Sequence, residues 1–331
     1  MTSDPASTVC ELAALRAGVA WADLPGRAVL LATGRDAVRF VDNFATAPLS
    51  RLNEGQGTES FFTDPRGWVI ALANILRTDD GLWIDAAPGI ATRLWEHLEH
   101  YHIREDVALV DASADRASVL IAGPLSADWI AARVAGAVPS RLFDHVRTRL
   151  GGVEVRLARM DWCGPDCFLV QMPTADESPF QRWLEAEDLP RADAADVECV
   201  RIVSGYPLPV DIPDKTLPQE IDRTARAISF TKGCYLGQET VARLDALGHV
   251  NRTLVLVAIE GPPPPAGSPV VCGDEVVGTI TSSCPSPAGG EAVGLAILHR
   301  KALAGTLAVQ GRTARVVDRP AGNAAVTLEG S

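Results

Sequence analysis

The hydrophobic pattern of the first third of the chain predicts short strands and helices. An apolar run at residues 28–33 (AVLLAT) predicts a strand, and the helix predicted after it contains Val38, Phe40 and Val41. Residues 52–67 (LNEGQGTESFFTDPRG) are rich in glycine and polar side chains. This composition is typical of a loop that carries a binding surface.

One order of elements is then predicted twice. Residues 68–77 and 82–85 are predicted strands around a hairpin turn (TDDG), and an amphipathic helix is predicted at residues 90–101. The same strand, turn, strand order returns at residues 153–162 and 167–172.

A helix is predicted to begin near Ser178 after this second hairpin. Ser178 as the N-cap, Pro179 at the first helical position and Gln181 form a predicted capping box. The repeat therefore predicts two related modules that face each other, with a ligand site in the crevice between them.

The region between the two hairpins predicts further strands at residues 106–111 and 118–122. A helix is predicted at residues 140–150, with Leu142, Val146 and Leu150 on one stripe and Gly151 and Gly152 closing it. This mixture favours an α+β fold over a doubly wound parallel sheet.

The pattern changes from residue 251 onward. Short apolar strands follow one another without a helical period, which predicts a small β-barrel or sandwich, and GPPPPAGSP is predicted to be a loop between two of them. We therefore expect a first α+β module over residues 1–105, which can interleave with a second over residues 106–248. A C-terminal β-barrel is expected over residues 249–331.

The charge of the chain limits its partners. A formal net charge of −12 and a pI of about 5.0 argue against an extended basic surface for nucleic acid, although a local basic cleft is compatible with them. No stretch approaches the ~18 apolar residues of a membrane span, and no signal peptide pattern is present. We expect a cytoplasmic protein that binds neither nucleic acid nor membranes directly.

Two groups of residues suggest a metal site, and each has a simpler explanation. The seven cysteines are scattered and odd in number, which fits reduced thiols, and the pair Cys163 and Cys167 fits a hairpin turn better than a zinc site. His97, His100 and His102 do not share one helix face and lie among acidic residues, which indicates a solvated surface. We expect no metal at either group.

The segment KGCYLGQE, residues 232–239, is the densest in chemistry. Gly233 and Gly237 permit tight turns, and Cys234 is a potential nucleophile. If a helix begins near Leu236, its positive end and Lys232 both favour a thiolate. The alternative is a buried structural cysteine, the common fate of a free thiol.

Glu239 and Arg243 also allow two interpretations. They are four residues apart, so they can form an exposed helical ion pair. Alternatively, Gln238 or Glu239 accepts hydrogen bonds from an aminopyrimidine-like edge while Arg243 binds a carboxylate.

The same segment, with Arg243 and GHVNR after it, resembles the signature of the YgfZ family of folate-binding proteins, relatives of the glycine-cleavage T-protein. Flanking segments also resemble the family, including residues 201–207, 217–220 and 228–230, and DPRG at residues 64–67 resembles its N-terminal "PKG". The resemblance implies a three-domain cloverleaf with a central folate site. It also implies folate-dependent support of iron-sulfur enzymes, including some that modify tRNA.

Two departures from the T-protein pattern disfavour aminomethyl transfer. The strand that carries the catalytic Asp in that pattern reads GWVIA at residues 67–71, and the "RLEAG" segment reads RIVSG at residues 201–205. An apolar side chain cannot take a proton. The rival hypotheses are a folate-dependent aminomethyl or methyl transferase or demethylase, and a non-catalytic adaptor that binds no folate.

We therefore predict a tetrahydrofolate-binding protein whose partners are iron-sulfur client or assembly proteins. Cys234 is the predicted reactive thiol, with Lys232 as its electrostatic support. The predicted folate contacts are Gly233, Tyr235, Gln238, Glu239, Arg243, Arg66, Arg201, Asp23 and Asp42.

Overall fold

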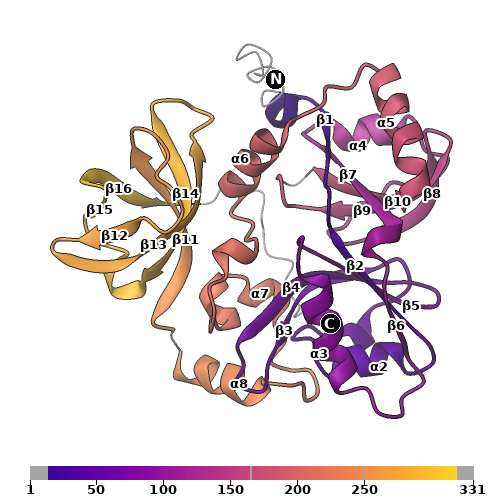
Figure 1. Ribbon diagram of the computed structural model, residues 1–331, viewed down its shortest axis with the longest axis horizontal. Coiled ribbons are helices and arrows are strands. Elements are labelled where there is room, and N and C mark those ends of the chain that lie inside the picture. Colours follow the sequence, from indigo (N-terminus) through magenta and orange to yellow (C-terminus); the bar gives the residue numbers. More distant parts are fainter. Residues whose placement is uncertain (1–13, 165, 249, 319–331) are drawn as a thin grey trace.

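The computed structural model describes residues 14–164, 166–248 and 250–318 and shows three lobes (Figure 1). Two lobes are modules built from a sheet and helices, and the third is a closed β-barrel. The predicted α+β cloverleaf is confirmed. Cys10 lies outside the described residues, as do positions 165 and 249.

The first module is an antiparallel sheet in the order β3-β4-β5-β2-β6. Helices α2 (Ala37–Asp42) and α3 (Ala91–His100) cover one face of it. Residues alternate along β5, so Leu82 and Ile84 point into the core under these helices, while Trp83 packs toward the second module. The strands are β2 (Ala28–Thr33), β3 (Gly57–Thr63), β4 (Val69–Arg77), β5 (Gly81–Ala86) and β6 (Ala108–Asp111).

The loop predicted for residues 52–67 is wrong over its second half, because residues 57–63 form β3. The sequence pattern did not predict this strand, because Thr58, Glu59 and Ser60 are polar and yet buried in it. Their side chains form hydrogen bonds and ion pairs inside the protein, so polarity here does not indicate exposure.

The second module is an antiparallel sheet in the order β1-β7-β10-β9-β8, with α4 (Ser126–Ala131) and α5 (Glu177–Ala186) packed on it. Strand β1 pairs with β7 although it precedes the whole first sheet in the chain, and β6 pairs back with β2. The two sheets therefore do not follow one another in the chain. The strands are β1 (Ala20–Asp23), β7 (Arg116–Ala122), β8 (His145–Leu150), β9 (Val153–Met160) and β10 (Cys167–Pro173).

The helix predicted for residues 140–150 is wrong, because residues 145–150 form β8, which pairs with β9. Gly151 and Gly152 both have positive φ, at 59° and 79°, and close a two-residue hairpin instead of capping a helix. The exposed Arg147 and Arg149 alternate with more buried residues, as a strand requires.

The capping box predicted at Ser178 is also wrong. Helix α5 begins at Glu177 with Asp176 as its N-cap, and no side chain caps it. The amide of Gln181 donates to Asp23 instead, at 2.8 Å. A tertiary contact has therefore replaced the local one.

The barrel closes in the order β11-β14-β13-β12-β15-β16. The proline run lies in the loop between β11 and β12, as predicted. Its strands are β11 (Arg252–Glu260), β12 (Pro269–Cys272), β13 (Glu275–Pro285), β14 (Glu291–His299), β15 (Leu307–Val309) and β16 (Arg312–Val317).

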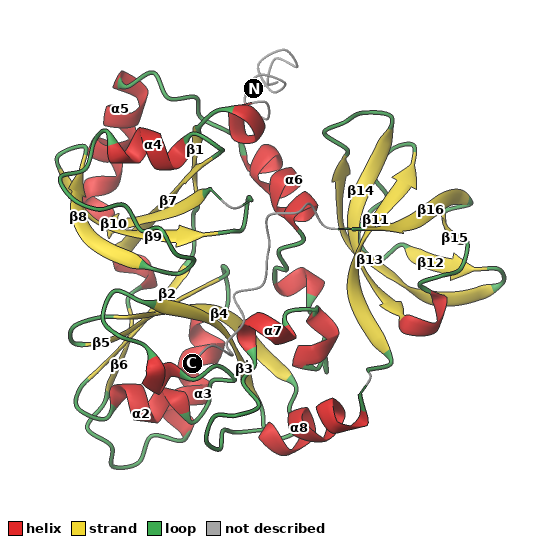
Figure 2. Ribbon diagram, turned by 180° about the vertical axis from the view of Figure 1, so that it is seen from behind, coloured by secondary structure: helices red, strands yellow, loops and turns green. Residues whose placement is uncertain are grey.

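Three helices connect the second module to the barrel: α6 (Ala194–Ser204), α7 (Thr224–Ala227) and α8 (Gln238–Leu247). Helix α6 lies between the second module and the barrel in both views (Figures 1 and 2). Ile202 of α6 and Leu295 of the barrel share one apolar cluster with Leu72 of β4. All three lobes thus meet near the C-terminal end of α6.

Candidate functional site

The segment at residues 232–239 joins α7 to α8 and is held against the first module by Lys232. Its Nζ donates to the carbonyl oxygens of Asp42, Ala45 and Ala47 at 2.6, 2.7 and 3.0 Å, and to the Asp42 carboxylate at 3.0 Å. Only 2% of its side chain is exposed. Burial lowers the pKa of Lys232, and the charge of Asp42 opposes that shift.

The backbone of the segment is anchored just as closely. The Leu236 N–H donates to the Asn43 carbonyl at 2.8 Å, and the Thr63 hydroxyl donates to the Leu236 carbonyl at 2.6 Å. Gly237 has a φ of 82°, and a Cβ there would lie 2.5 Å from the Asp64 carbonyl oxygen. Only glycine fits this contact, so the segment is a rigid turn before α8.

Cys234 is exposed on this turn and is not a core residue. Its neighbour Gly233 is exposed, with no atom within 4 Å of where a Cβ would stand, whereas Tyr235 is buried and burial raises the pKa of its phenol. Among the described cysteines, Cys272 is partly exposed, and Cys163, Cys167, Cys199 and Cys284 are buried. The fold therefore presents the Cys234 thiol to solvent on a fixed backbone.

The polar residues of α8 and of the 64–67 turn lie at the surface. Glu239 and Arg243 are exposed, and these two described residues do not form the predicted ion pair with each other. Gln238 begins the helix and is partly buried. Arg66 is exposed, with its guanidinium 5.0 Å from the centre of the Trp68 ring.

Asp23 and Arg201 are engaged elsewhere. Asp23 lies in the second sheet, where it accepts hydrogen bonds from Arg191 and Gln181. Arg201 is buried in α6 and donates to Asp211 at 2.8 Å and to the Ser282 hydroxyl of the barrel at 3.0 Å. Among the predicted site residues, Lys232 contacts both Asp42, through an ion pair, and the ring of Tyr235.

A second polar group, which the sequence analysis missed, is buried where the modules meet. We call Glu59, Asp161, Arg223 and Arg226 the central ion cluster. Arg223 Nε lies 2.6 Å from Glu59 Oε2, Arg226 Nη1 lies 2.6 Å from Asp161 Oδ2, and Arg223 Nη2 lies 3.9 Å from Asp161 Oδ1. Burial alone would lower the pKa of Arg223, but the charge of Glu59, its hydrogen bond to Arg223 and the charge of Asp161 together raise it above its ordinary value.

The central ion cluster contains more hydrogen-bonding capacity than it uses. Within the described ranges, these buried atoms have no hydrogen-bond partner: Glu59 Oε1, Asp161 Oδ1, Arg223 Nη2, Arg226 Nε and Nη2, and Trp162 Nε1 nearby. Buried polar atoms are nearly always paired, so a group of them indicates a place for a polar ligand or for water. In the sequence, the feature that could have indicated this cluster is the pair of arginines in IDRTARAISF, residues 221–230. Most residues of this segment are buried in the structure.

The two metal alternatives find no support in the described part of the chain. No group of three or more His, Cys, Asp or Glu side chains able to hold a metal ion occurs there. His97 packs edge-on against Phe44 and Tyr101, and burial lowers its pKa to about 4. No described helix is both long and apolar enough to cross a membrane.

Comparison with known families matches most of the chain. Residues 4–199 match the model of the GCVT N-terminal domain, and residues 252–321 match that of the glycine cleavage T-protein C-terminal barrel domain. The chain belongs to the glycine-cleavage T-protein family. The two models cover both modules and the barrel, and the stretch between them, residues 200–251, contains most of the segments that resemble the YgfZ family.

Relatives within this superfamily carry different names. The tRNA-modifying protein YgfZ of Edwardsiella ictaluri is 32% identical over 67% of this chain and 66% of its own length. The mitochondrial iron-sulfur cluster assembly factor IBA57 of Mus musculus is 28% identical over 91% of this chain and 84% of its own length. The chain thus spans just under two thirds of the YgfZ relative.

The fold is shared with a solved aminomethyltransferase. The crystal structure of the glycine cleavage system aminomethyltransferase T from Bartonella henselae superimposes with a TM-score of 0.80 at 17% identity, covering 96% of this chain and 90% of that one. At this identity the match establishes the common architecture.

Proposed function

We propose that this protein is a YgfZ-like folate-binding protein that supports the assembly or repair of iron-sulfur enzymes, with Cys234 as its reactive thiol. The observation that carries the proposal is the exposed Cys234 on a backbone fixed by Lys232 and Gly237. The names of the YgfZ and IBA57 relatives support the same role. Its partners are then iron-sulfur client or assembly proteins in the cytoplasm.

The central ion cluster fits the polar edge of a folate. A pterin presents amino and ring N–H donors beside a carbonyl acceptor. Glu59 Oε1 and Asp161 Oδ1 are unused acceptors, and Arg223 and Arg226 hold unused donors. We propose that these four residues hold the pterin. Bound tetrahydrofolate supplies a carrier for one-carbon units.

The residues predicted from the sequence take different parts in this proposal. Arg66 and Arg243 are exposed cations, suited to the carboxylates of the glutamate tail. Gly233, Tyr235, Gln238 and Glu239 are proposed to line the approach to Cys234. Asp42, Asp23 and Arg201 are bonded within the protein, and we propose that they support the fold around the ligand.

The exposed thiol is suited to chemistry with a partner protein. A thiolate attacks electrophiles, exchanges with disulfides and binds iron as a soft ligand. Each of these reactions requires access to the sulfur, which Cys234 has and the buried Cys163, Cys167, Cys199 and Cys284 lack.

Aminomethyl transfer is the second candidate, because the family includes aminomethyltransferases. The strand position expected to carry the catalytic carboxylate is occupied by Ala71 in β4, which is buried with apolar neighbours. No proton can be taken there. Turnover of an aminomethyl or N-methyl substrate with tetrahydrofolate would favour this candidate over ours.

Folate binding is tested by thermal unfolding with tetrahydrofolate. A ligand at 100 times its dissociation constant adds about 2.7 kcal/mol to the free energy of unfolding. We expect a clear rise in melting temperature in the wild type, a much smaller one in Glu59→Gln, and an unchanged one in the surface control Glu275→Gln. No rise at saturating ligand in the wild type would favour the adaptor hypothesis.

The role of the thiol is tested separately, in a strain that lacks the protein. Cys234→Ala should fail to restore the activity of iron-sulfur enzymes. The matched control Cys272→Ala, at a partly exposed cysteine of the barrel, should restore it. Full restoration by Cys234→Ala would contradict a working thiol.

A further inference from the structure

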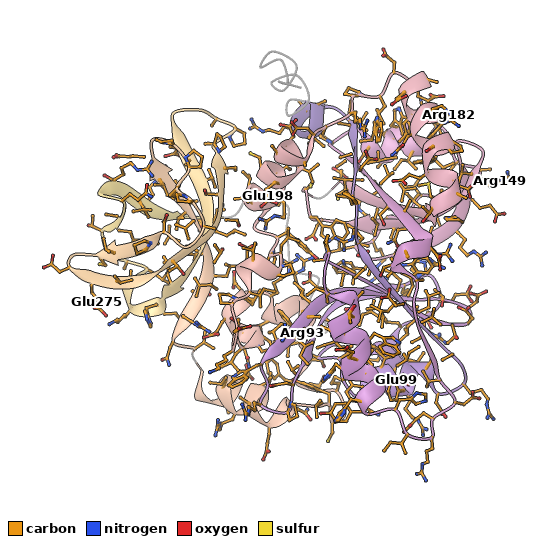
Figure 3. The ribbon with its side chains drawn as sticks, in the orientation of Figure 1. Arg93, Glu99, Arg149, Arg182, Glu198 and Glu275 are labelled. Carbon is orange, nitrogen blue, oxygen red and sulfur yellow. The ribbon has the colours of Figure 1, made fainter. Side chains whose placement is uncertain are left out.

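A cavity of about 600 Å³ lies between the two sheets. None of its lining residues belongs to the 232–239 segment or to the central ion cluster. Its walls include Trp83 of β5, Arg116 of β7, Arg156 of β9 and Gln171 of β10, with Arg147 and Arg149 of β8 also lining it. Arg149 lies on the side of the molecule away from the barrel (Figure 3). A volume of this size is typical of small-molecule sites.

Two guanidinium groups stack on the indole of Trp83. The Cζ atoms of Arg116 and Arg156 lie 5.2 and 4.7 Å from the ring centre. Neither arginine forms an ion pair with any described carboxylate. The buried Arg27, Arg201, Arg223 and Arg226, by contrast, all do.

The partner of Arg156 does not neutralise it. Arg156 Nη1 lies 2.8 Å from His145 Nδ1, and His145 Nε2 lies 3.0 Å from the Arg77 carbonyl oxygen. The ring therefore donates through Nε2 and accepts from Arg156 in its neutral form. Burial, together with Arg147, lowers the pKa of Arg156 to about 10, which leaves it charged at neutral pH.

The lining contains three acidic residues and four arginines. The acidic residues are Asp79, Asp80 and Glu154. Asp80 accepts from the Thr78 hydroxyl at 2.8 Å. All three acidic residues are exposed, as are Arg147 and Arg149, whereas Arg116 and Arg156 are half-buried. The inner wall of the cavity therefore presents positive charge, and the acids lie toward solvent.

Four buried polar atoms of the wall have no partner in the described part of the chain. Three are donors, namely Trp83 Nε1, Arg116 Nε and Arg156 Nε, and one is the acceptor Gln171 Oε1. The Gln171 amide is fixed, because its Nε2 donates to Asp85 at 3.1 Å and to Ser118 at 3.3 Å. Trp83 and Gln171 are 7% and 2% exposed, so bulk water does not satisfy them.

We propose that this cavity binds a small oxyanion, a carboxylate or a phosphate, that carries an N–H or O–H group beside the anion. The three unused donors and two unpaired cations match the anion, because Arg and Trp N–H groups donate without accepting. Gln171 Oε1 matches the neighbouring N–H or O–H. The proposal does not depend on folate, since none of the four residues of the central ion cluster lines this cavity.

Calorimetric titration of the full chain with four probes tests this proposal at low ionic strength. At pH 8, N-acetyl-L-glutamate and phosphoethanolamine each carry an anion near an N–H donor, whereas glutarate and ethyl phosphate carry no N–H or O–H donor. We expect one site per chain. At least one of the first two probes should bind about tenfold tighter than its matched control, as expected for one hydrogen bond to a buried acceptor.

The two arms distinguish the sources of the anion. Preference for N-acetylglutamate identifies a carboxylate ligand, and preference for phosphoethanolamine identifies a phosphate ligand. Absence of binding by all four probes at millimolar concentration overturns the proposal, as does equal binding within both matched pairs.

Substitutions locate the site. Arg156→Gln should weaken binding of the better probe by about tenfold or more, through loss of a charged hydrogen bond. Trp83→Phe keeps an aromatic ring but removes the indole N–H, and should weaken binding several-fold. Arg182→Gln, at an exposed arginine on α5, serves as the control (Figure 3). Equal affinity in Arg156→Gln, Trp83→Phe and Arg182→Gln would overturn the placement.

Discussion

The 232–239 segment and the central ion cluster contrast sharply. The segment contains several reactive residue types, yet its lysine donates to three carbonyl oxygens and a carboxylate, and its thiol is exposed. The cluster is dispersed along the chain, yet it holds several buried polar atoms without partners. A conspicuous sequence motif can thus serve mainly to anchor the backbone. The unpaired polar atoms that could bind a ligand lie instead where segments distant in the chain come together.

The largest expected effect concerns the cluster. Arg223→Ala leaves Glu59 buried without its ion partner, and we expect the free energy of unfolding to fall by about 3–5 kcal/mol in urea denaturation. Replacing both partners, as Glu59→Leu with Arg223→Met, should recover most of this loss because no charge is left unpaired. A loss below about 1 kcal/mol in Arg223→Ala would show that the cluster is not a buried, paired unit.

The second prediction concerns the anchor. Lys232→Met removes the donor to four oxygen atoms at once, and we expect a loss of about 2–3 kcal/mol, because buried acceptors are left unsatisfied. Lys301→Met, at an exposed ion pair of the barrel, is the control and should leave the urea midpoint unchanged. Equal midpoints for the two variants would mean that Lys232 is not structural.

The third prediction concerns His145, which is hydrogen-bonded to Arg156 in the wall of the cavity between the sheets. Burial, with a contribution from Arg156, lowers the pKa of His145 to about 4. The unfolded chain, with a histidine pKa of about 6.5, therefore binds more protons between these values, so stability is full above pH 6.5 and falls as the pH decreases toward 4. Between pH 7 and 5 this histidine should account for a loss of about 2 kcal/mol.

The measurement is the difference between wild type and His145→Gln in urea denaturation at several pH values. The variant should show a flatter dependence on pH in this window. His100→Gln, at an exposed histidine of α3, should keep the slope of the wild type. Parallel curves for wild type and His145→Gln would contradict the buried neutral ring.

The smallest effect on stability is expected at the exposed thiol of Cys234. Cys234→Ser should change the free energy of unfolding by less than about 0.5 kcal/mol, because the side chain is exposed. Titration of native thiols with a disulfide reagent should nevertheless lose one fast-reacting group in this variant. Cys284→Ser, at a buried cysteine, should leave the fast phase intact. The reverse result would mean that Cys234 is covered.

Local pattern was sufficient for the elements whose environment is simple. The apolar runs of β2, β4, β5, β9 and β10 and the amphipathic helix α3 were predictable, because their periodicity follows directly from burial on one or both faces. Strands β3 and β8 were not, because β3 buries polar side chains and β8 exposes charged ones beside a glycine pair. Their neighbours in the sheet, rather than their own pattern, determine their structure.

The sequence by itself determined the three-part organisation, the terminal barrel and the family, and it offered Cys234 as a candidate thiol. Tertiary structure decided which charges are anchors and which atoms lack partners. Glu59 and Arg223 are 164 residues apart, and Gln171 and Asp85 are 86 apart. The first contact forms when the segment before α7 packs against β3, and the second when the two sheets pack together. No periodicity along the chain encodes a pairing between positions so distant.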